Sequence, residues 1–214
     1  ELGDQAGEGG SLSNIGALYA DLGQYMEALD YYEQALKIRR GIGDRAGEGL
    51  SLNNIGGIYE MQGRYVEALT HYKQALSILQ EIGDRTTEGA TLSNIASTHH
   101  SQGQHAKALT YSKQALSIFQ EISDQAGEAA VLNQIGFLHI GLGQYAEALT
   151  FLKQALTIRH EIGDRVGEGM TLNNTGVVYQ SMGQYGDAVK YFQQSIKLIE
   201  TLREELDVEE FKSS

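Results

Sequence analysis

A 40-residue repeat is the feature that most restricts how this chain can fold. Gly-Asp recurs at the same position in four copies of the repeat, and Ser123-Asp124 occupies that position in the remaining copy. An alanine keeps the same period at Ala28, Ala68, Ala108, Ala148 and Ala188. A period of about 20–50 residues is typical of a solenoid, in which each unit buries its apolar face only against its neighbours. Because a solenoid offers a groove rather than an enclosed pocket, the repeat favours a binding scaffold over an enzyme.

The second copy, residues 44–83, shows how one unit is expected to fold. Asp44 can cap a first helix, and Gly63 can end it. A second helix should run from Tyr65 to just before Gly83. Apolar residues recur at three- and four-residue spacing along both segments, which is the period of a helix with one buried face. The sequence therefore predicts an all-α fold, an α-solenoid of five helix-turn-helix units.

The repeat also predicts the domain boundaries. The units are expected at residues 4–43, 44–83, 84–123, 124–163 and 164–199, forming one array over residues 1–199. The acidic segment 200–214 should either cap the array as a helix or begin a linker. Because Glu1-Leu2-Gly3-Asp4 matches Glu81-Ile82-Gly83-Asp84 inside the array, we expect the chain to begin within a longer array.

The recurring residues resemble a known family. Its pattern is matched by Leu12, Ile15-Gly16, Tyr19, Ala28, Tyr32 and Ala35, with equivalents every 40 residues. This pattern resembles the tetratricopeptide repeat (TPR) over essentially all of residues 4–200. The unit is longer than the usual one of about 34 residues, lacks proline, and has leucine where tryptophan is common. It looks like the repeats of the Pins/LGN polarity adaptors and of cyanobacterial-style bacterial arrays, and is more distantly similar to kinesin light chain. The resemblance implies a right-handed superhelical α-solenoid. It also implies a non-enzymatic scaffold that holds a protein or peptide partner in a concave groove.

A slot rich in asparagine recurs on the face that lines the groove in that family. Asparagine is a poor helix former, and its amide presents donors and an acceptor together. One interpretation is a ladder that grips the main chain of an extended ligand. The other is that these side chains bond neighbouring helices and tie the repeats together. The residues concerned are Asn14, Asn53, Asn54, Asn94, Asn133, Gln134, Asn173 and Asn174.

Selectivity is expected from groove positions that differ between the copies. Gly57, Phe137 and Val177 occupy one such slot, with Ala17 and Ser97. Met61 occupies a second slot, together with Asp21, and Met170 a third. Phe137, Met61 and Met170 would be apolar contacts for a ligand side chain. The alternative is ordinary drift on an exposed face.

Composition and charge narrow the classes of function. The net charge of −12 disfavours nucleic acid and anionic membranes as partners, because both require basic patches. No apolar run approaches the length of a membrane span and no signal peptide is present, so we expect a cytoplasmic protein. His99, His100 and His105 are close in sequence but are expected on different faces, which predicts no metal site. No nucleophile–base constellation is visible, so we expect no cofactor and no catalysis.

Two other functions stay open. The array is alternatively a structural spacer or self-associating module of a larger bacterial signalling protein, through end-to-end or groove-mediated contacts. A third interpretation is a ligand-sensing regulatory array.

Overall fold

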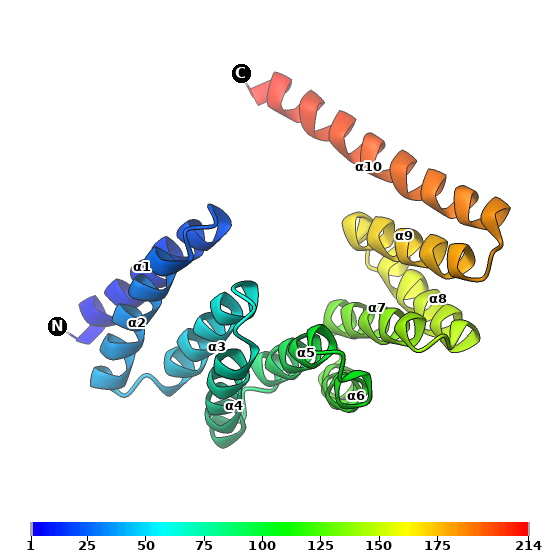
Figure 1. The fold of residues 1–214 in the computed structure, drawn as a ribbon. Helices are drawn as coiled ribbons and strands as arrows, with labels where there is room; N and C mark the ends of the chain where they lie inside the picture. The colour runs from blue at the N-terminus through cyan, green and yellow to red at the C-terminus, as the bar shows by residue number, and fades with distance from the viewer. Residues whose placement is uncertain (1, 214) are drawn as a thin grey trace. The chain divides into compact units, whose positions relative to one another are not determined.

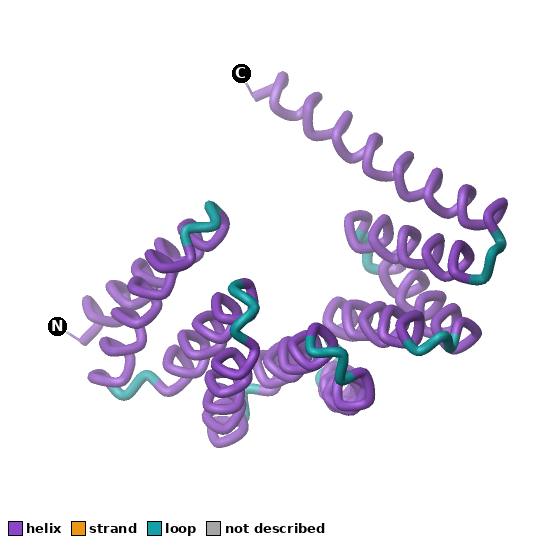
Figure 2. Tube along the Cα trace, viewed as in Figure 1, coloured by secondary structure: helices purple, strands orange, loops and turns teal. Residues whose placement is uncertain are grey.

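The computed structural model describes residues 2–213, with side chains for residues 5–205. Within this range the chain forms α-helices joined by short turns, and no strand occurs (Figure 1, Figure 2). The helices are α1 Leu2–Asp21, α2 Tyr25–Ile42, α3 Arg45–Met61, α4 Tyr65–Ile82, α5 Arg85–Ser101, α6 His105–Glu121, α7 Gln125–Gly141, α8 Tyr145–Glu161, α9 Arg165–Ser181 and α10 Tyr185–Ser213. The predicted all-α fold of tandem helical hairpins is confirmed.

Successive helices pack in pairs, as α1 with α2, α3 with α4, α7 with α8 and α9 with α10 (Figure 1). Neighbouring hairpins also touch, through α2 with α3, α4 with α5 and α8 with α9. The chain divides into two compact units, residues 1–118 (unit 1) and 119–214 (unit 2), and the boundary falls within α6. No linker-like composition marks this division in the sequence.

The junctions between hairpins carry the aspartate and glycine residues of the repeat. Asp44 caps α3 by accepting a hydrogen bond from the Gly47 N–H at 2.9 Å, and Asp84, Asp124 and Asp164 cap their helices in the same way. Gly43, Gly83 and Gly163 end the second helices with φ between 71° and 73°. Ser123 holds the equivalent position at φ 56°, in the left-handed region that favours glycine.

The glycine in the middle of the first helix makes room for a ring of the second. A Cβ at Gly56 would lie 2.7 Å from the Tyr72 ring, and one at Gly176 would lie 2.6 Å from Phe192. In the third copy the same pair is Ala96 and Ser112, where a smaller partner leaves space for a methyl group. The close approach within each hairpin therefore depends on matched residue sizes.

A stacked ring pair recurs at the turn end of the hairpins. Tyr19 stacks on Tyr31 with ring centroids 5.3 Å apart. His99 stacks on Tyr111 and His139 on Phe151 at the same distance. These two histidines therefore replace the tyrosine of the other copies as ring partners.

His100 and His105 correct one expectation from the sequence. They were expected on different faces, but the turn between α5 and α6 brings their rings together, with Nδ1 atoms 3.2 Å apart. Among the residues with described side chains, no group of three or more potential metal ligands converges. None of the described helices combines the length and apolar character that crossing a membrane requires.

Arginines from second helices join neighbouring hairpins. Arg39 of α2 donates from Nη1 to the Gly47 carbonyl at 2.8 Å and to the Ser51 hydroxyl at 2.9 Å. Arg159 of α8 makes the same two bonds, to the Gly167 carbonyl and the Thr171 hydroxyl. Burial lowers the pKa of Arg159, and the Asp164 carboxylate opposes that shift.

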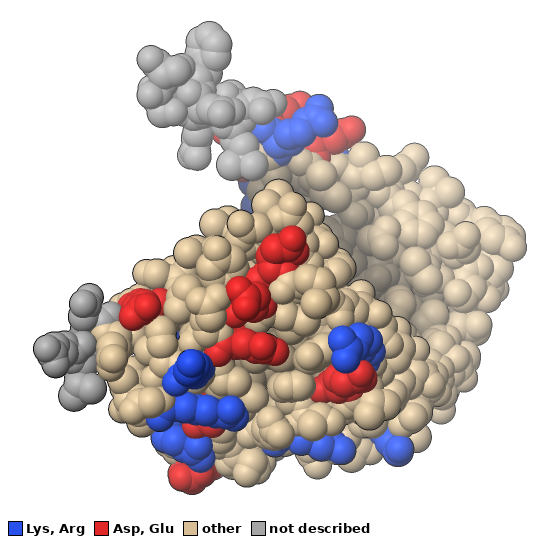
Figure 3. Space-filling model, turned by 60° about the vertical axis from the view of Figure 1, so that its left-hand side comes forward, with Lys and Arg blue, Asp and Glu red and all other residues tan. Residues whose placement is uncertain are grey.

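Charged groups at the helix starts add further bonds at these joints. Glu48 accepts from Arg40 at 2.8 Å and from Arg45 at 2.6 Å. Burial of Glu48 acts to raise its pKa, but these two hydrogen bonds outweigh it and hold the pKa below the usual value. Basic and acidic side chains accordingly lie side by side on the face shown in Figure 3. In unit 2, Arg165 reaches from α9 to Glu205 on the continuation of α10, at 2.6 Å.

Candidate functional site

The largest pocket described in unit 1, hereafter the unit 1 pocket, is an open depression of about 510 Å³. Its walls come from residues of α1, α3 and α5, and from the rings of Tyr32 on α2 and Tyr72 on α4. Its thirteen lining residues are Ala17, Ala20, Asp21, Tyr32, Asn53, Asn54, Gly57, Ile58, Glu60, Met61, Tyr72, Asn94 and Ser97. The structure brings five of the predicted groove residues together here: Asn53, Asn54, Gly57, Met61 and Asn94.

Asn53 connects the second and third copies at the floor of this pocket. Its Oδ1 accepts a hydrogen bond from Asn94 Nδ2 at 3.2 Å and one from the Thr91 hydroxyl at 3.1 Å. Both donors lie on α5, so these bonds link α3 to the neighbouring hairpin. They are contacts of the kind that the second interpretation of the asparagine slot expects.

Asn94 keeps hydrogen-bonding capacity after its bond to Asn53. A primary amide carries two N–H donors and a carbonyl oxygen that accepts two bonds. One N–H is directed at Asn53, which leaves the second N–H and Oδ1 for another partner. Asn54 lies beside it, half-buried and lining the pocket, and the described side chains give it no hydrogen bond.

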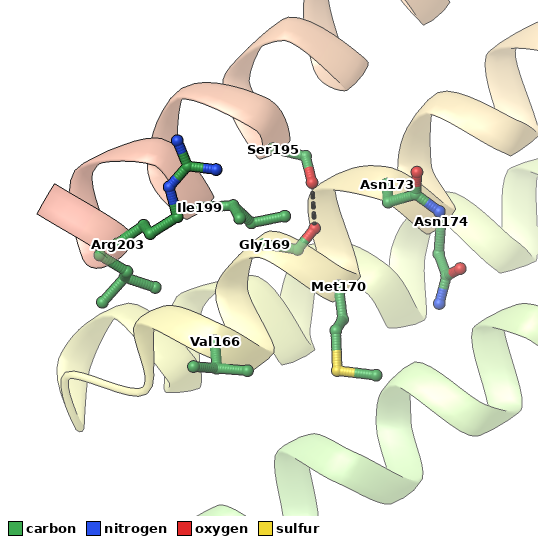
Figure 4. A pocket seen from close by; sticks show the side chains of 9 residues that line it. Val166, Gly169, Met170, Asn173, Asn174, Ser195, Ile199 and Arg203 are labelled. Atoms are coloured by element: carbon green, nitrogen blue, oxygen red, sulfur yellow. Dashed lines mark hydrogen bonds between the residues drawn. The ribbon is translucent and has the colours of Figure 1, made fainter. Parts of the chain in front are cut away.

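The unit 2 pocket lies between α9 and α10 and has a volume of about 550 Å³. Its walls are mostly apolar, with Met170 60% exposed and Ile199 57% exposed. In Figure 4, Val166 and Met170 project from α9, and Ile199 and Arg203 from α10. Ser195, which replaces the usual alanine, donates to the Gly169 carbonyl at 2.8 Å and closes the gap between the two helices (Figure 4).

The asparagine slot in unit 2 repeats the arrangement of unit 1. Asn174 donates from Nδ2 to Asn133 Oδ1 at 3.1 Å, linking α9 to α7. Met170, Asn173 and Asn174 line the unit 2 pocket. The remaining predicted residues line neither pocket: Asn14, Asn133, Gln134, Phe137 and Val177.

Several pocket residues were not predicted as functional. In unit 1 these include Glu60, whose Oε2 accepts from the Tyr72 hydroxyl at 2.9 Å. Burial raises the pKa of Tyr72, and the charge and hydrogen bond of Glu60 raise it further. In unit 2 they include Val166, Ile199, Leu202 and Arg203. In this part of the chain the sequence differs from the other copies at Ser195, which replaces an alanine. That difference alone does not predict a pocket.

The comparisons with known proteins agree with this architecture. A family model described as "Tetratricopeptide repeat" matches residues 9–81, 51–121, 87–161 and 127–201, which together span most of the chain. A comparison with curated protein sequences found no significant match.

Three solved structures illustrate the likeness in fold. BtubC (BKLC) from P. vanneervenii is 22% identical with a TM-score of 0.78, over 90% of this chain and 80% of that one. A Rap protein complexed with competence and sporulation factor is 21% identical with a TM-score of 0.78, over 87% of this chain and 52% of that one. This chain therefore spans about half of the Rap chain.

The third structure carries repeats of a similar kind. It is a Podosopora anserina putative kinesin light chain with nearly identical TPR-like repeats, 20% identical with a TM-score of 0.72, over 90% of this chain and 95% of that one. Identities this low establish the fold alone, while the family match covers most of the sequence directly. The chain belongs to the tetratricopeptide repeat family.

Proposed function

We propose that this protein is an interaction scaffold and that each of its two units can hold an extended segment of a protein partner. The observation that carries the proposal is the asparagine slot. Asn54 has no hydrogen bond to the described side chains, and Asn94 and Asn174 each keep a donor and an acceptor after bonding the neighbouring copy. Such amides can pair with the N–H and C=O of an extended main chain without reading its sequence.

The two interpretations of the slot are compatible in this arrangement. Asn53 and Asn133 accept the bonds that tie the copies together. Asn54, Asn94 and Asn174 then supply the groups that face a ligand. The Rap neighbour was solved with its competence and sporulation factor, so a related fold also holds a bound factor.

Alanine substitution at the ligand-facing amides tests the proposal. A ligand is first selected from a displayed library of random dodecapeptides with the wild-type protein. Replacing Asn54, Asn94 and Asn174 by alanine should weaken binding of that peptide about tenfold or more, while the helix content by circular dichroism stays unchanged. Each lost hydrogen bond costs roughly 1 kcal/mol, and Asn54 and Asn94 would both act on a ligand held in unit 1.

A matched control separates the effect on ligand binding from the loss of the hydrogen bond between repeats. Asn133→Ala removes the same bond as Asn174→Ala, but Asn133 does not line the unit 2 pocket. We expect Asn174→Ala to weaken the peptide more than Asn133→Ala does, at similar losses of stability. Equal effects on binding, or no effect of the triple substitution, would contradict the ladder.

Self-association is a second candidate function, favoured by the faces of α1 and α10. Leu18 on α1 is 63% exposed, whereas Ile58, Thr98, Leu138 and Val178 in the same slot are exposed by 3% or less. Ile199 on α10 is 57% exposed, whereas Leu79, Phe119 and Arg159 are exposed by 6% or less. The helix face that is buried between neighbouring hairpins is thus exposed on both α1 and α10. The α1 helix of one protein molecule can therefore stack on the α10 helix of another.

One charged slot limits this stacking. Glu48, Glu88 and Glu128 each accept a hydrogen bond from the residue eight positions earlier, which is Arg40, Gln80 or Gln120. Stacking α1 on α10 in the same register would place Glu8 against Glu200, two like charges. Glu200→Arg should therefore strengthen association measured by light scattering from 10 to 500 µM, and Ile199→Glu should abolish it. A Glu200→Arg protein that is strictly monomeric at 500 µM would contradict this candidate.

A further inference from the structure

Two carboxylates line the unit 1 pocket without a lining counter-ion. Asp21 is exposed and Glu60 half-buried, and both face the same depression as Asn54 and Asn94. None of the thirteen residues that line this pocket is Lys, Arg or His. Glu60 receives one hydrogen bond, on Oε2 from Tyr72, and its Oε1 is left for another donor. The pocket therefore presents negative charge that the described residues around it do not neutralise.

The positions of these acids on their helices are unfavourable for folding. Asp21 is the last residue of α1, and Glu60 lies in the last turn of α3. The C-terminal end of a helix carries partial negative charge, so an acid there costs about 0.3–1 kcal/mol rather than stabilising the helix. Neither Asp21 nor Glu60 has an ion pair among the described residues, so the charge of each is available to a ligand.

The other copies show that the hairpin does not require an acid at either slot. The slot of Asp21 holds Met61, Ser101, Gly141 and Ser181. The slot of Glu60 holds Ala20, His100, Ile140 and Gln180. The acids occur only in the first two copies, both in unit 1, and both line its pocket. By contrast, the unit 2 pocket is mostly apolar and carries Arg203.

We propose that the unit 1 pocket binds a lysine or arginine side chain of the partner segment, between the carboxylates of Asp21 and Glu60. This inference rests on the proposed function and adds the chemistry of the ligand. The cationic head would donate hydrogen bonds to both carboxylates, and Met61, which is 62% exposed, would cover its aliphatic stem. Asn54 and Asn94 would hold the adjoining main chain.

Three peptides that differ at one position provide the test. Each is acetylated and amidated, with the sequence Ser-Ala-Ser-X-Ser-Ala-Ser, where X is arginine, norleucine or glutamate. Dissociation constants come from titrations followed by NMR chemical shifts. We expect the arginine peptide to bind about fivefold tighter than the norleucine peptide and the glutamate peptide to bind more weakly than both. The preference for arginine should shrink between 0.05 M and 0.5 M salt.

The fifth copy supplies substitutions that the fold tolerates. Asp21→Ser and Glu60→Gln introduce the residues that Ser181 and Gln180 place in the same slots. Glutamine can still accept the hydrogen bond from Tyr72. The double variant should bind the arginine and norleucine peptides equally, with the affinity for norleucine unchanged.

A control removes the same number of charges elsewhere. Glu147→Gln with Glu161→Gln alters two exposed acids of unit 2 and should keep the preference for arginine. Loss of the preference in this control would assign it to overall charge and overturn the inference.

The outcomes also separate this inference from the proposed function. If the wild type binds all three peptides equally and Asn54→Ala weakens them all, the scaffold proposal stands and the cation site is refuted. If none of the three peptides binds, both are contradicted.

Discussion

At the scale of single residues, the left-handed position between hairpins shows how strictly the copies are constrained. Gly43, Gly83 and Gly163 have φ of 71° to 73°, and Ser123 adopts 56° at the same place. A residue with a Cβ in this region pays a steric cost of about 1–2 kcal/mol that glycine avoids. Ser123 is thus a weak point in unit 2 that the repeat pattern makes visible.

Ser123→Gly should therefore stabilise the protein by about 1 kcal/mol, because the strain it relieves exceeds the extra chain entropy of glycine. The reverse change, Gly163→Ser, should destabilise it by a similar amount. Urea denaturation followed by circular dichroism measures both. A Ser123→Gly protein less stable than the wild type would show that the serine makes a compensating contact.

The matched sizes within a hairpin lead to a second prediction at this scale. Gly56→Ala should destabilise by about 1–3 kcal/mol through its clash with Tyr72, less about 1 kcal/mol gained in helix propensity. In a Tyr72→Ser background the same change should stabilise, because Ala96 and Ser112 form that pair in the third copy. The coupling in this double-mutant cycle should be about 1 kcal/mol or more.

Gly57→Ala is the control for helix propensity. Its Cβ would meet only the Tyr72 hydroxyl at 3.6 Å, which is an ordinary contact. This substitution should stabilise in both backgrounds. If Gly56→Ala behaves like Gly57→Ala, the close packing of Gly56 against Tyr72 is not the constraint.

At the scale of helices and hairpins, the joints use two kinds of chemistry. Arg39 and Arg159 bond a carbonyl and a hydroxyl of the next first helix, with Ser51 and Thr171 as the hydroxyl partners. Phe119 fills the same slot in unit 2 with a ring, where a Cβ at Gly127 would lie within 3 Å of it. The residue at this position of the second helix thus differs between the joints, as Arg39, Phe119 and Arg159 show.

The third hairpin, α5–α6, should be sensitive to mild acid. Burial lowers the pKa of His99, with Lys107 and Lys73 acting in the same direction, and burial lowers the pKa of His100 with His105 adding to it. The unfolded chain then takes up protons more readily than the folded one as the pH falls below about 6.5. The free energy of unfolding should therefore decrease between pH 7.5 and 5.5.

Substitutions from other copies test this assignment. His99→Tyr with His100→Gln introduces the residues of Tyr59 and Gln180 and should reduce the loss of stability between the two pH values. His160→Gln, at an exposed site with glutamine in two other copies, should leave that loss unchanged. An unchanged loss in the double variant would place the acid sensitivity elsewhere.

At the scale of the whole molecule, the sequence predicted the hairpins well because their determinants recur. Asp44, Gly56 and Gly83 act within one hairpin, through capping, close approach and a left-handed turn, so a 40-residue period is enough to recognise them. The division into two units was not predicted, since residues around 118 show no change in composition.

The candidate sites were only partly predictable. Asn53 and Asn94 occupy adjacent positions of the repeat, and the sequence does not show that the first accepts and the second donates in a bond between copies. Glu60 was not predicted because the positions expected to face a ligand were the neighbouring ones of Gly57 and Met61. Its place in the pocket depends on how the last turn of α3 packs. Val166 and Ile199 were missed because they meet only when α9 and α10 pack.

The central claim is that groove amides pair with the main chain of a ligand, and backbone methylation of a selected peptide tests it most directly. A peptide that lacks one N–H at the position bound by Asn54 should bind the wild type about fivefold or more weakly than its parent. The Asn54→Ala variant should bind the two peptides equally, because the partner of that N–H is gone. Equal loss of affinity in both proteins would contradict the claim.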